Sequence, residues 1–156
     1  MYTTILVACI SAIAAIGIYM AVTNLVTKNS IRKRREAALK EAEAHKGPSL
    51  VIAYAPCINH GIAKSMKVSQ AEQKLAVECG YWPLFRYSPE LAAEGKNPFQ
   101  LDSPAPDSGK MMDYLKGENR YASLQINFPD RAQRLYEKTV QDAKDRYAKY
   151  RKMAED

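Results

Sequence analysis

The longest apolar pattern in the chain covers residues 5–26, a run of 22 residues without a charged side chain. As a helix this run is about 33 Å long, which matches the hydrocarbon thickness of a bilayer. A cleavable signal peptide carries its positive charges before the apolar run, whereas here they follow it. The pattern therefore predicts one transmembrane helix within residues 1–27. The alternative, a buried helix, is disfavoured because a small domain can hardly cover so long an uncharged run.

Strong helix formers occupy residues 32–44, and a Gly-Pro pair at 47–48 ends that pattern. Residues 28–47 are thus expected to form a basic juxtamembrane segment and a helix. The next run, residues 49–54 (SLVIAY), is continuously apolar and predicts a strand buried in a parallel sheet. Such a strand needs neighbours, and without them it leaves apolar surface and open edges. A helix, a turn and a buried strand form half of an α/β repeat, so residues 48–108 are expected to be the end of an α/β domain.

A helix is predicted next, because Ser69 and Glu72 have the spacing of a capping box and Gly80 provides a stop. The apolar face of this helix is expected to consist of Ala71, Leu75 and Cys79. An aromatic stretch at 81–87 and a short run at 99–101 predict extended structure within a proline-rich loop region.

A helical tail is predicted for residues 109–156. Residues 110–126 should form one or two short helices with a break at Gly117, and Pro129 suits the first turn of a final helix. The broad apolar stripe of that helix favours packing on its own protein, and a coiled-coil partner is the alternative. The stripe consists of Ala132, Leu135, Tyr136, Val140, Ala143, Tyr147, Tyr150 and Ala154.

The formal charge of +6 comes from 23 Lys and Arg against 17 Asp and Glu. Five positive charges lie between Lys28 and Arg35, directly after the apolar run, and the chain beyond them is nearly neutral. A nucleic-acid-binding domain carries basic surface across its fold, so no nucleic-acid partner is expected. Positive charges beside a membrane helix mark its cytoplasmic side. We therefore expect a membrane anchor at residues 5–26 with the C-terminal domain in the cytoplasm, and a cytoplasmic protein if the apolar segment is not used.

Candidate catalytic chemistry is sparse. The three cysteines, Cys9, Cys57 and Cys79, are widely spaced and odd in number, so no disulfide framework is expected. Cys57 follows Pro56 after the predicted strand, where α/β proteins place ligands, and His60 lies three residues later. This arrangement is compatible with a metal pair, an activated thiol or a structural cysteine. Cys79 is expected in the core, and the isolated glycines form no phosphate-binding loop.

Several strings in this part of the chain resemble the carboxyl-terminal region of pyruvate:ferredoxin (flavodoxin) oxidoreductase, in the same order. They are EAEA at 41–44, GPSLVIAYAPCINHG at 47–61, QKLAVE at 73–78, GYWPLFRY at 80–87, GKNPFQLDS at 95–103 and GENRY at 117–121. The likeness covers about residues 36–156, whereas residues 1–35 are expected to be unrelated to that family.

The resemblance implies a fold, cofactors and one site residue. In that family pyruvate is oxidatively decarboxylated on thiamine diphosphate to acetyl-CoA, and electrons leave through iron–sulfur clusters to ferredoxin or flavodoxin. The cysteine of the PCINHG string is the last of four thiolates on the [4Fe–4S] cluster nearest the thiamine, which corresponds here to Cys57. The expected fold is an α/β fragment, the end of a thiamine-diphosphate-binding domain, with a helical C-terminal tail and one N-terminal transmembrane helix.

The resemblance also implies that essential parts lie elsewhere. The other three cluster cysteines and the segment that binds thiamine diphosphate and Mg²⁺ lie upstream in the family and are absent from this sequence. We therefore expect a fragment without catalytic residues of its own and inactive alone. It would complete a cluster with Cys57 only when a partner chain supplies the thiamine site and the remaining cysteines. The alternative is a membrane-anchored, non-enzymatic remnant or interaction protein from a truncated gene.

Overall fold

A computed structural model describes residues 19, 32, 33 and 35–155 of the chain. The predicted transmembrane helix at residues 5–26 thus lies outside the described residues, apart from Tyr19, and so does Cys9. Within the described part, no helix is both long and apolar enough to cross a membrane. The chain divides into two compact units, Met1–Ala53 and Tyr54–Asp156, which are described separately below.

The described part of the first unit contains the helix predicted at residues 32–44, which is confirmed over residues 35–44. A turn follows it, in which the Gly47 N–H donates to the His45 carbonyl over 3.0 Å. The Ser49 hydroxyl donates to the Ala42 carbonyl over 2.8 Å and ties the outgoing chain to the helix end.

The strand predicted at residues 49–54 is the main departure from expectation. Residues 48–57 adopt no regular secondary structure, and the side chains of Leu50 and Ile52 are 83% and 69% exposed. Among the described residues, no backbone-to-backbone hydrogen bond involves residues 48–56. The prediction of a buried strand in a parallel sheet is therefore wrong for the described chain. The physical reason is that a strand is completed by the backbone groups of its neighbours, and the described residues supply none.

The second unit combines helices with one small sheet. Its elements in chain order are the 3₁₀ turn η1 (Met66–Val68), α2 (Ser69–Glu78), β1 (Phe85–Tyr87), α3 (Pro89–Ala93), β2 (Phe99–Leu101), the 3₁₀ turn η2 (Ser108–Lys110), α4 (Met111–Gly117), α5 (Asn119–Asn127) and α6 (Pro129–Glu155). The predicted strand at 99–101, the helix break at Gly117 and the start of the last helix at Pro129 are all confirmed.

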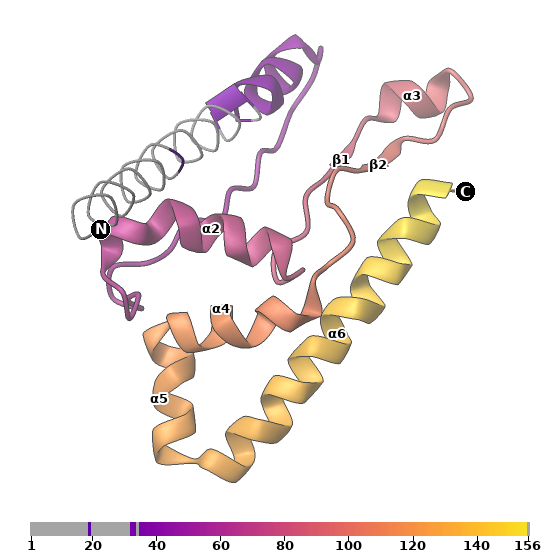
Figure 1. Cartoon of the computed structure of the whole chain (residues 1–156). Coiled ribbons are helices and arrows are strands. Elements are labelled where there is room, and N and C mark those ends of the chain that lie inside the picture. The colour runs from indigo at the N-terminus through magenta and orange to yellow at the C-terminus, as the bar shows by residue number, and fades with distance from the viewer. Residues whose placement is uncertain (1–18, 20–31, 34, 156) are drawn as a thin grey trace, which may run out of the picture. The chain divides into compact units, whose positions relative to one another are not determined.

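The only sheet among the described residues is the antiparallel pair β1 and β2, in which Phe85 faces Leu101 and Tyr87 faces Phe99. It lies beside the C-terminal end of α6 (Figure 1). The rings of Phe85 and Phe99 stack at 5.3 Å between centroids, and Tyr150 of α6 contacts both. The Asn97 amide donates to the Met153 carbonyl over 2.8 Å, which fixes the hairpin to the end of the long helix.

The N-cap of helix α2 and its buried face differ from the prediction. Its N-cap is Val68 without a side-chain hydrogen bond, so Ser69 and Glu72 do not form a capping box. Glu72 is instead 6% exposed, and its carboxylate lies against Gly117. The buried face consequently consists of Glu72, Ala76 and Cys79, at spacings of four and three. The predicted burial of Cys79 is confirmed, whereas Ala71 is exposed.

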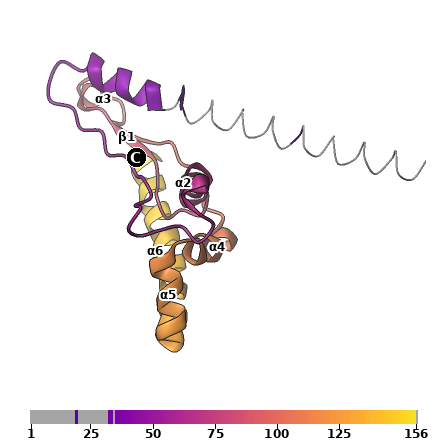
Figure 2. The same cartoon turned by 90° about the vertical axis from the view of Figure 1, so that its left-hand side faces the viewer.

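The core of the second unit lies where α2, α4 and α6 meet, and both views place α2 beside α4 (Figures 1 and 2). Its largest fully buried side chains are Tyr114, Met111 and Cys79. From α6 the core receives Ala132, Tyr136 and Ala143. The other residues of the predicted stripe are half-buried, apart from Leu135, which is 42% exposed. A mixed helix and strand fold with a helical C-terminal part is thus confirmed. The domain boundaries at residues 27, 47 and 108 stay predictions.

Candidate functional site

The predicted site residue, Cys57, lies on a short loop between residues 48–56, which have no regular secondary structure, and η1. The Gly61 N–H donates to the Cys57 carbonyl over 2.9 Å and closes a turn that carries the thiol. Gly61 has a φ of +73°, a conformation that side chains with a Cβ rarely adopt. A Cβ at this position would also lie 2.5 Å from the Asn119 amide nitrogen, so the end of that side chain would have to turn aside.

The junction between α4 and α5 holds this loop in place. The Ala63 N–H donates to the Gly117 carbonyl over 2.8 Å, and the Asn119 N–H donates to the Gly61 carbonyl over 3.1 Å. Ile62, which is buried, forms an antiparallel bridge with Glu118. These backbone contacts attach the loop on both sides of the helix break at Gly117.

The thiol of Cys57 is exposed and surrounded by donors. The backbone N–H groups of His60 and Asn59 donate to its sulfur and lower the pKa of Cys57, and the positive charge of Arg120 acts in the same direction. Hydrogen bonds and nearby positive charge favour a thiolate, the form of cysteine that binds metals. Cys57 therefore has the electrostatic environment of a metal ligand or a reactive thiol.

A buried carboxyl, that of Glu118, lies beside the His60 side chain of this loop. The Oε2 atom of Glu118 lies 3.2 Å from Nε2 of His60, and the His60 ring packs edge-on against Tyr121. Burial raises the pKa of Glu118 and lowers the pKa of His60, and the Arg120 charge lowers the latter further. Both shifts favour the neutral form of each group. The Nε2 atom of His60 and the Oε1 atom of Glu118 nevertheless have no hydrogen-bond partner among the described residues. The Glu118 carboxyl and the Tyr121 ring thus pack against the His60 side chain, while the His60 backbone N–H reaches Cys57.

A second buried carboxyl, Glu72, lies near the first. Glu72 and Glu118 are 6% and 2% exposed, and the Oε1 atom of each has no hydrogen-bond partner among the described residues. Burial raises the pKa of Glu72, and the neighbouring Glu118 raises it further, against a smaller opposite effect of Lys64. A Cβ at Gly117 would lie 2.5 Å from Oε1 of Glu72, so the glycine at the helix break makes room for this carboxyl.

Paired tyrosine hydroxyls line the same interior. The hydroxyls of Tyr54 and Tyr114 are 2.7 Å apart, and those of Tyr81 and Tyr121 are 2.6 Å apart. The Tyr136 hydroxyl donates to the Tyr121 carbonyl. Burial and these hydrogen bonds raise the pKa of Tyr114 and Tyr121 well above the ordinary value. These hydrogen bonds fix the positions of the aromatic rings.

The described residues do not bring Cys57 together with another thiol. Cys79 is buried in the core with its sulfur 3.5 Å from the Ala76 carbonyl, and burial raises the pKa of its thiol. Nowhere in the described ranges do three or more His, Cys, Asp or Glu side chains gather as a metal site would require. Cys57 alone fits a thiolate ligand of an iron–sulfur cluster, and no described residue is assigned to thiamine diphosphate or its Mg²⁺.

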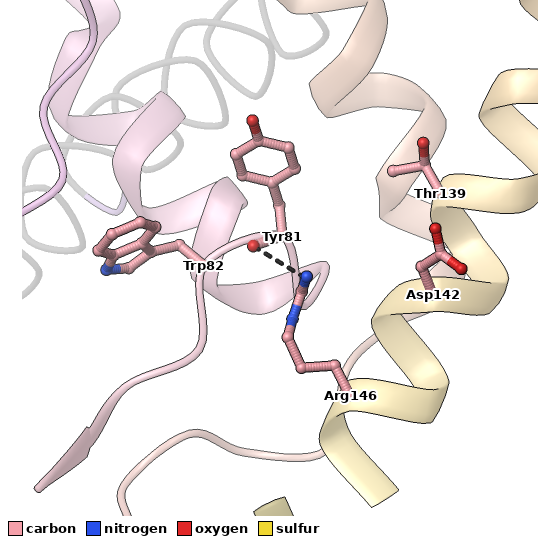
Figure 3. Close-up of a pocket in the computed structure, with 5 residues that line it drawn as sticks. All are labelled: Tyr81, Trp82, Thr139, Asp142 and Arg146. Carbon is pink, nitrogen blue, oxygen red and sulfur yellow. Dashed lines mark hydrogen bonds between the residues drawn. The ribbon is translucent and has the colours of Figure 1, made fainter. Parts of the chain in front are cut away.

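A separate open pocket of about 280 Å³ lies between the loop after α2 and helix α6 (Figure 3). It is lined by Tyr81, Trp82, Thr139, Asp142 and Arg146. Arg146 is committed to the fold, because its Nη2 atom donates to the Gly80 and Tyr81 carbonyls over 3.0 and 3.1 Å. These two hydrogen bonds therefore join α6 to the loop that follows α2.

Sequence reasoning missed Glu118 and Glu72 as parts of the site. Glu72 shares a helix face with Ala76 and Cys79, and this spacing could have indicated a buried carboxyl. Glu118 directly follows the glycine at the helix break, but its inward direction depends on the loop that packs on it.

No protein-family model matches the chain. Curated relatives do match. A pyruvate:ferredoxin oxidoreductase of Moorella thermoacetica is 58% identical over 118 residues, which are 76% of this chain and 10% of that protein. A pyruvate-flavodoxin oxidoreductase of Klebsiella pneumoniae is 55% identical over 117 residues, 75% of this chain and 10% of that protein. The chain spans about a tenth of the length of these relatives, and the similarity fits a fragment of such an enzyme.

The lengths of the matches locate them on the chain. A match of 118 residues leaves out only 38 of 156, so it must include residues 39–118 and therefore the Cys57 loop and Glu118. A putative pyruvate-flavodoxin oxidoreductase of Synechocystis is 40% identical over 138 residues, 88% of this chain and 11% of that protein. This match must include residues 19–138, so it extends into the segment that was expected to be unrelated. The comparisons give no support to a transmembrane helix there.

Proposed function

We propose that the chain is a part of a pyruvate:ferredoxin or pyruvate:flavodoxin oxidoreductase that contributes one ligand, Cys57, to a [4Fe–4S] cluster. The observation that carries this proposal is the thiol itself, which is exposed and receives two backbone N–H groups on a loop held by the α4–α5 junction. Hydrogen bonds to sulfur and controlled solvent exposure are means by which proteins tune such clusters.

The complete reaction needs a second polypeptide. A four-iron cluster requires four thiolates, and the described residues place only one at the surface. The partner chain would supply the other three cysteines together with the site for thiamine diphosphate and Mg²⁺. The assembled enzyme would oxidise pyruvate to acetyl-CoA and pass electrons to ferredoxin or flavodoxin, and the chain alone would be inactive.

Anaerobic reconstitution tests this proposal. The full chain is mixed with an M. thermoacetica enzyme lacking the region similar to it, then supplied with iron, sulfide and thiamine diphosphate. We expect the mixture to gain cluster absorption and pyruvate-driven reduction of a viologen dye. Cys57→Ser should abolish both gains, whereas Cys79→Ala should retain them because Cys79 is buried in the core. Equal gains with wild type and Cys57→Ser would show that Cys57 is not a ligand.

A second candidate is a membrane-anchored, non-enzymatic remnant, favoured by the uncharged run at 5–26 and the basic residues after it. On this proposal the C-terminal part lies in the cytoplasm, the purified chain binds no iron with any partner, and Cys57→Ser changes nothing. Cell fractionation tests the anchor, since recovery of the chain in the soluble fraction without detergent contradicts it. In that case the chain is proposed to be cytoplasmic.

A further inference from the structure

Arg120, near the start of α5, is held beside the loop of the candidate site by its two neighbours in sequence. The N–H of Asn119 donates to the Gly61 carbonyl over 3.1 Å, and the ring centroid of Tyr121 lies 5.2 Å from that of His60. Because the residues before and after it both contact the loop, the backbone of Arg120 has a fixed position next to the loop.

The guanidinium of Arg120 carries its charge to this loop. The residue is exposed, and no ion pair joins its side chain to another of the described residues. The pKa of Cys57 is lowered first by the backbone N–H groups of His60 and Asn59 and then by the charge of Arg120. Burial, and then the same charge, lower the pKa of His60. The field of one guanidinium therefore reaches both the first residue of the loop and its histidine.

Burial of the two nearby carboxyls limits how far they offset the charge of Arg120. Burial raises the pKa of Glu118 and of Glu72, which favours their uncharged forms. Lys64 is exposed on the same loop and adds a second positive charge. We therefore expect a positive electrostatic potential around the Cys57 thiol.

A positive potential at this position has a specific consequence for an iron–sulfur cluster. Net charge, hydrogen bonds to sulfur and solvent exposure set the reduction potential of such a cluster. Reduction adds a negative charge, and a nearby positive charge stabilises the reduced form by Coulomb attraction. The backbone N–H groups at Cys57 provide the hydrogen bonds, and Arg120 provides the charge.

We propose that Arg120 raises the reduction potential of the cluster to which Cys57 contributes a ligand, by placing a positive charge beside that ligand. This inference rests on the proposed function, from which it takes the cluster. It adds a role that depends on the charge of the side chain and not on its hydrogen bonds. Lysine should therefore replace arginine at this position, and glutamine should not.

Alkylation of Cys57 in the purified full chain tests the local charge without a cluster. The rate with anionic iodoacetate is divided by the rate with neutral iodoacetamide, and mass spectrometry of the Cys57 peptide follows both reactions. Both reagents are attacked by the same thiolate, so the ratio cancels the thiolate fraction and reports the electrostatic potential at the sulfur. Arg120→Gln should lower the ratio about threefold at low ionic strength, and Arg120→Lys should retain it.

Lys67→Gln is the matched control for this measurement. Lys67 is also exposed and lies on η1 after the loop, and its substitution removes the same charge, but it is not among the groups that shift the pKa of Cys57. The ratio in Lys67→Gln should stay close to that of the wild type. An unchanged ratio in Arg120→Gln, or an equal fall in Lys67→Gln, would overturn the proposal.

Redox titration of the reconstituted mixture with the truncated M. thermoacetica enzyme, followed by electron paramagnetic resonance, tests the effect on the cluster. The relevant signal is the one that Cys57→Ser removes. Arg120→Gln should shift the equilibrium toward the oxidised cluster by about threefold to tenfold, and tenfold corresponds to about 59 mV for a one-electron couple. Arg120→Lys and Lys67→Gln should keep the wild-type potential.

The two measurements separate this inference from the proposed function. A Cys57-dependent cluster whose potential is the same in the wild type and Arg120→Gln overturns the role of Arg120 and leaves Cys57 standing as a ligand. Failure of the wild type to form any Cys57-dependent cluster refutes the proposed function, and the role of Arg120 at the cluster with it, even where the alkylation ratio depends on Arg120.

Discussion

Three glycines with nearly the same positive φ angle allow the free-energy cost of a close contact to be isolated. Gly61, Gly80 and Gly95 have φ angles of +73°, +80° and +73°. Alanine in this conformation costs about 1–2 kcal/mol wherever it occurs, because its Cβ approaches the following carbonyl oxygen. Differences between the three alanine variants therefore report what surrounds each residue.

The atoms that a Cβ would meet differ among the three glycines. A Cβ at Gly95 has no heavy atom within 4 Å, whereas a Cβ at Gly80 lies 2.6 Å from Cβ of Pro106. The proline ring cannot rotate away, so its backbone must move, and overpacking of this kind costs about 1–3 kcal/mol more. The contact at Gly61 is with the terminal amide of Asn119, which can turn aside, so the extra cost there should be smaller.

We expect the free energy of unfolding to fall by about 1–2 kcal/mol in Gly95→Ala and by about 2–5 kcal/mol in Gly80→Ala. Gly61→Ala should lie between them. Urea denaturation monitored by fluorescence of Trp82, the only tryptophan, measures all three. Trp82 packs against Tyr54, with ring centroids 5.5 Å apart, and so reports on the second unit.

A double-mutant cycle provides the decisive control. Pro106→Gly removes the atoms that the new methyl group meets, so the Gly80→Ala and Pro106→Gly substitutions should couple favourably by about 1–3 kcal/mol. If Gly80→Ala costs no more than Gly95→Ala and the cycle shows no coupling, the close approach at Pro106 does not determine the stability of this turn.

Three further substitutions or treatments test the site. Burial raises the folded-state pKa of Glu118 above 4.5, so the free energy of unfolding of the wild type should fall as the pH rises from 4.5 until Glu118 ionises in the folded state. Urea denaturation at several pH values should show a weaker pH dependence for Glu118→Gln. Iodoacetamide should alkylate Cys57 at lower pH than Cys79, as mass spectrometry of the peptides can show, since the pKa of the former thiol is lowered and that of the latter raised. Tyr114→Phe should lower the free energy of unfolding by about 1 kcal/mol through loss of the hydroxyl pair with Tyr54.

Local chemistry explains which elements could be predicted from sequence. Pro129 sets the backbone angle of a first helical turn and Gly117 interrupts a helical pattern, so α4, α5 and α6 begin or end where expected. The short strand at 99–101 was likewise predicted from its composition and confirmed. These features depend on residues close in sequence and therefore hold whatever surrounds them.

The arrangement of the candidate site could not be predicted in the same way, because it depends on contacts between segments that are distant in sequence. Ser69 and Glu72 have capping-box spacing, yet Glu72 turns toward Gly117, some 45 residues later, because the glycine leaves space there. Residues 49–54 have the composition of a buried strand, but pairing needs a neighbour that the described chain does not supply. Cys57 was identified through its resemblance to a family, whereas its supporting carboxyl, Glu118, became evident only from the packing of the loop.

The paired hydroxyls of Tyr54 and Tyr114 also attach the start of the Cys57 loop to the core of the second unit. The Tyr54 hydroxyl lies 2.7 Å from that of Tyr114, which is fully buried, and Tyr54 precedes Cys57 by three residues. The chain therefore enters the loop from a residue whose side chain is already tied to the core, and the first residues of the loop have little freedom to move away from it.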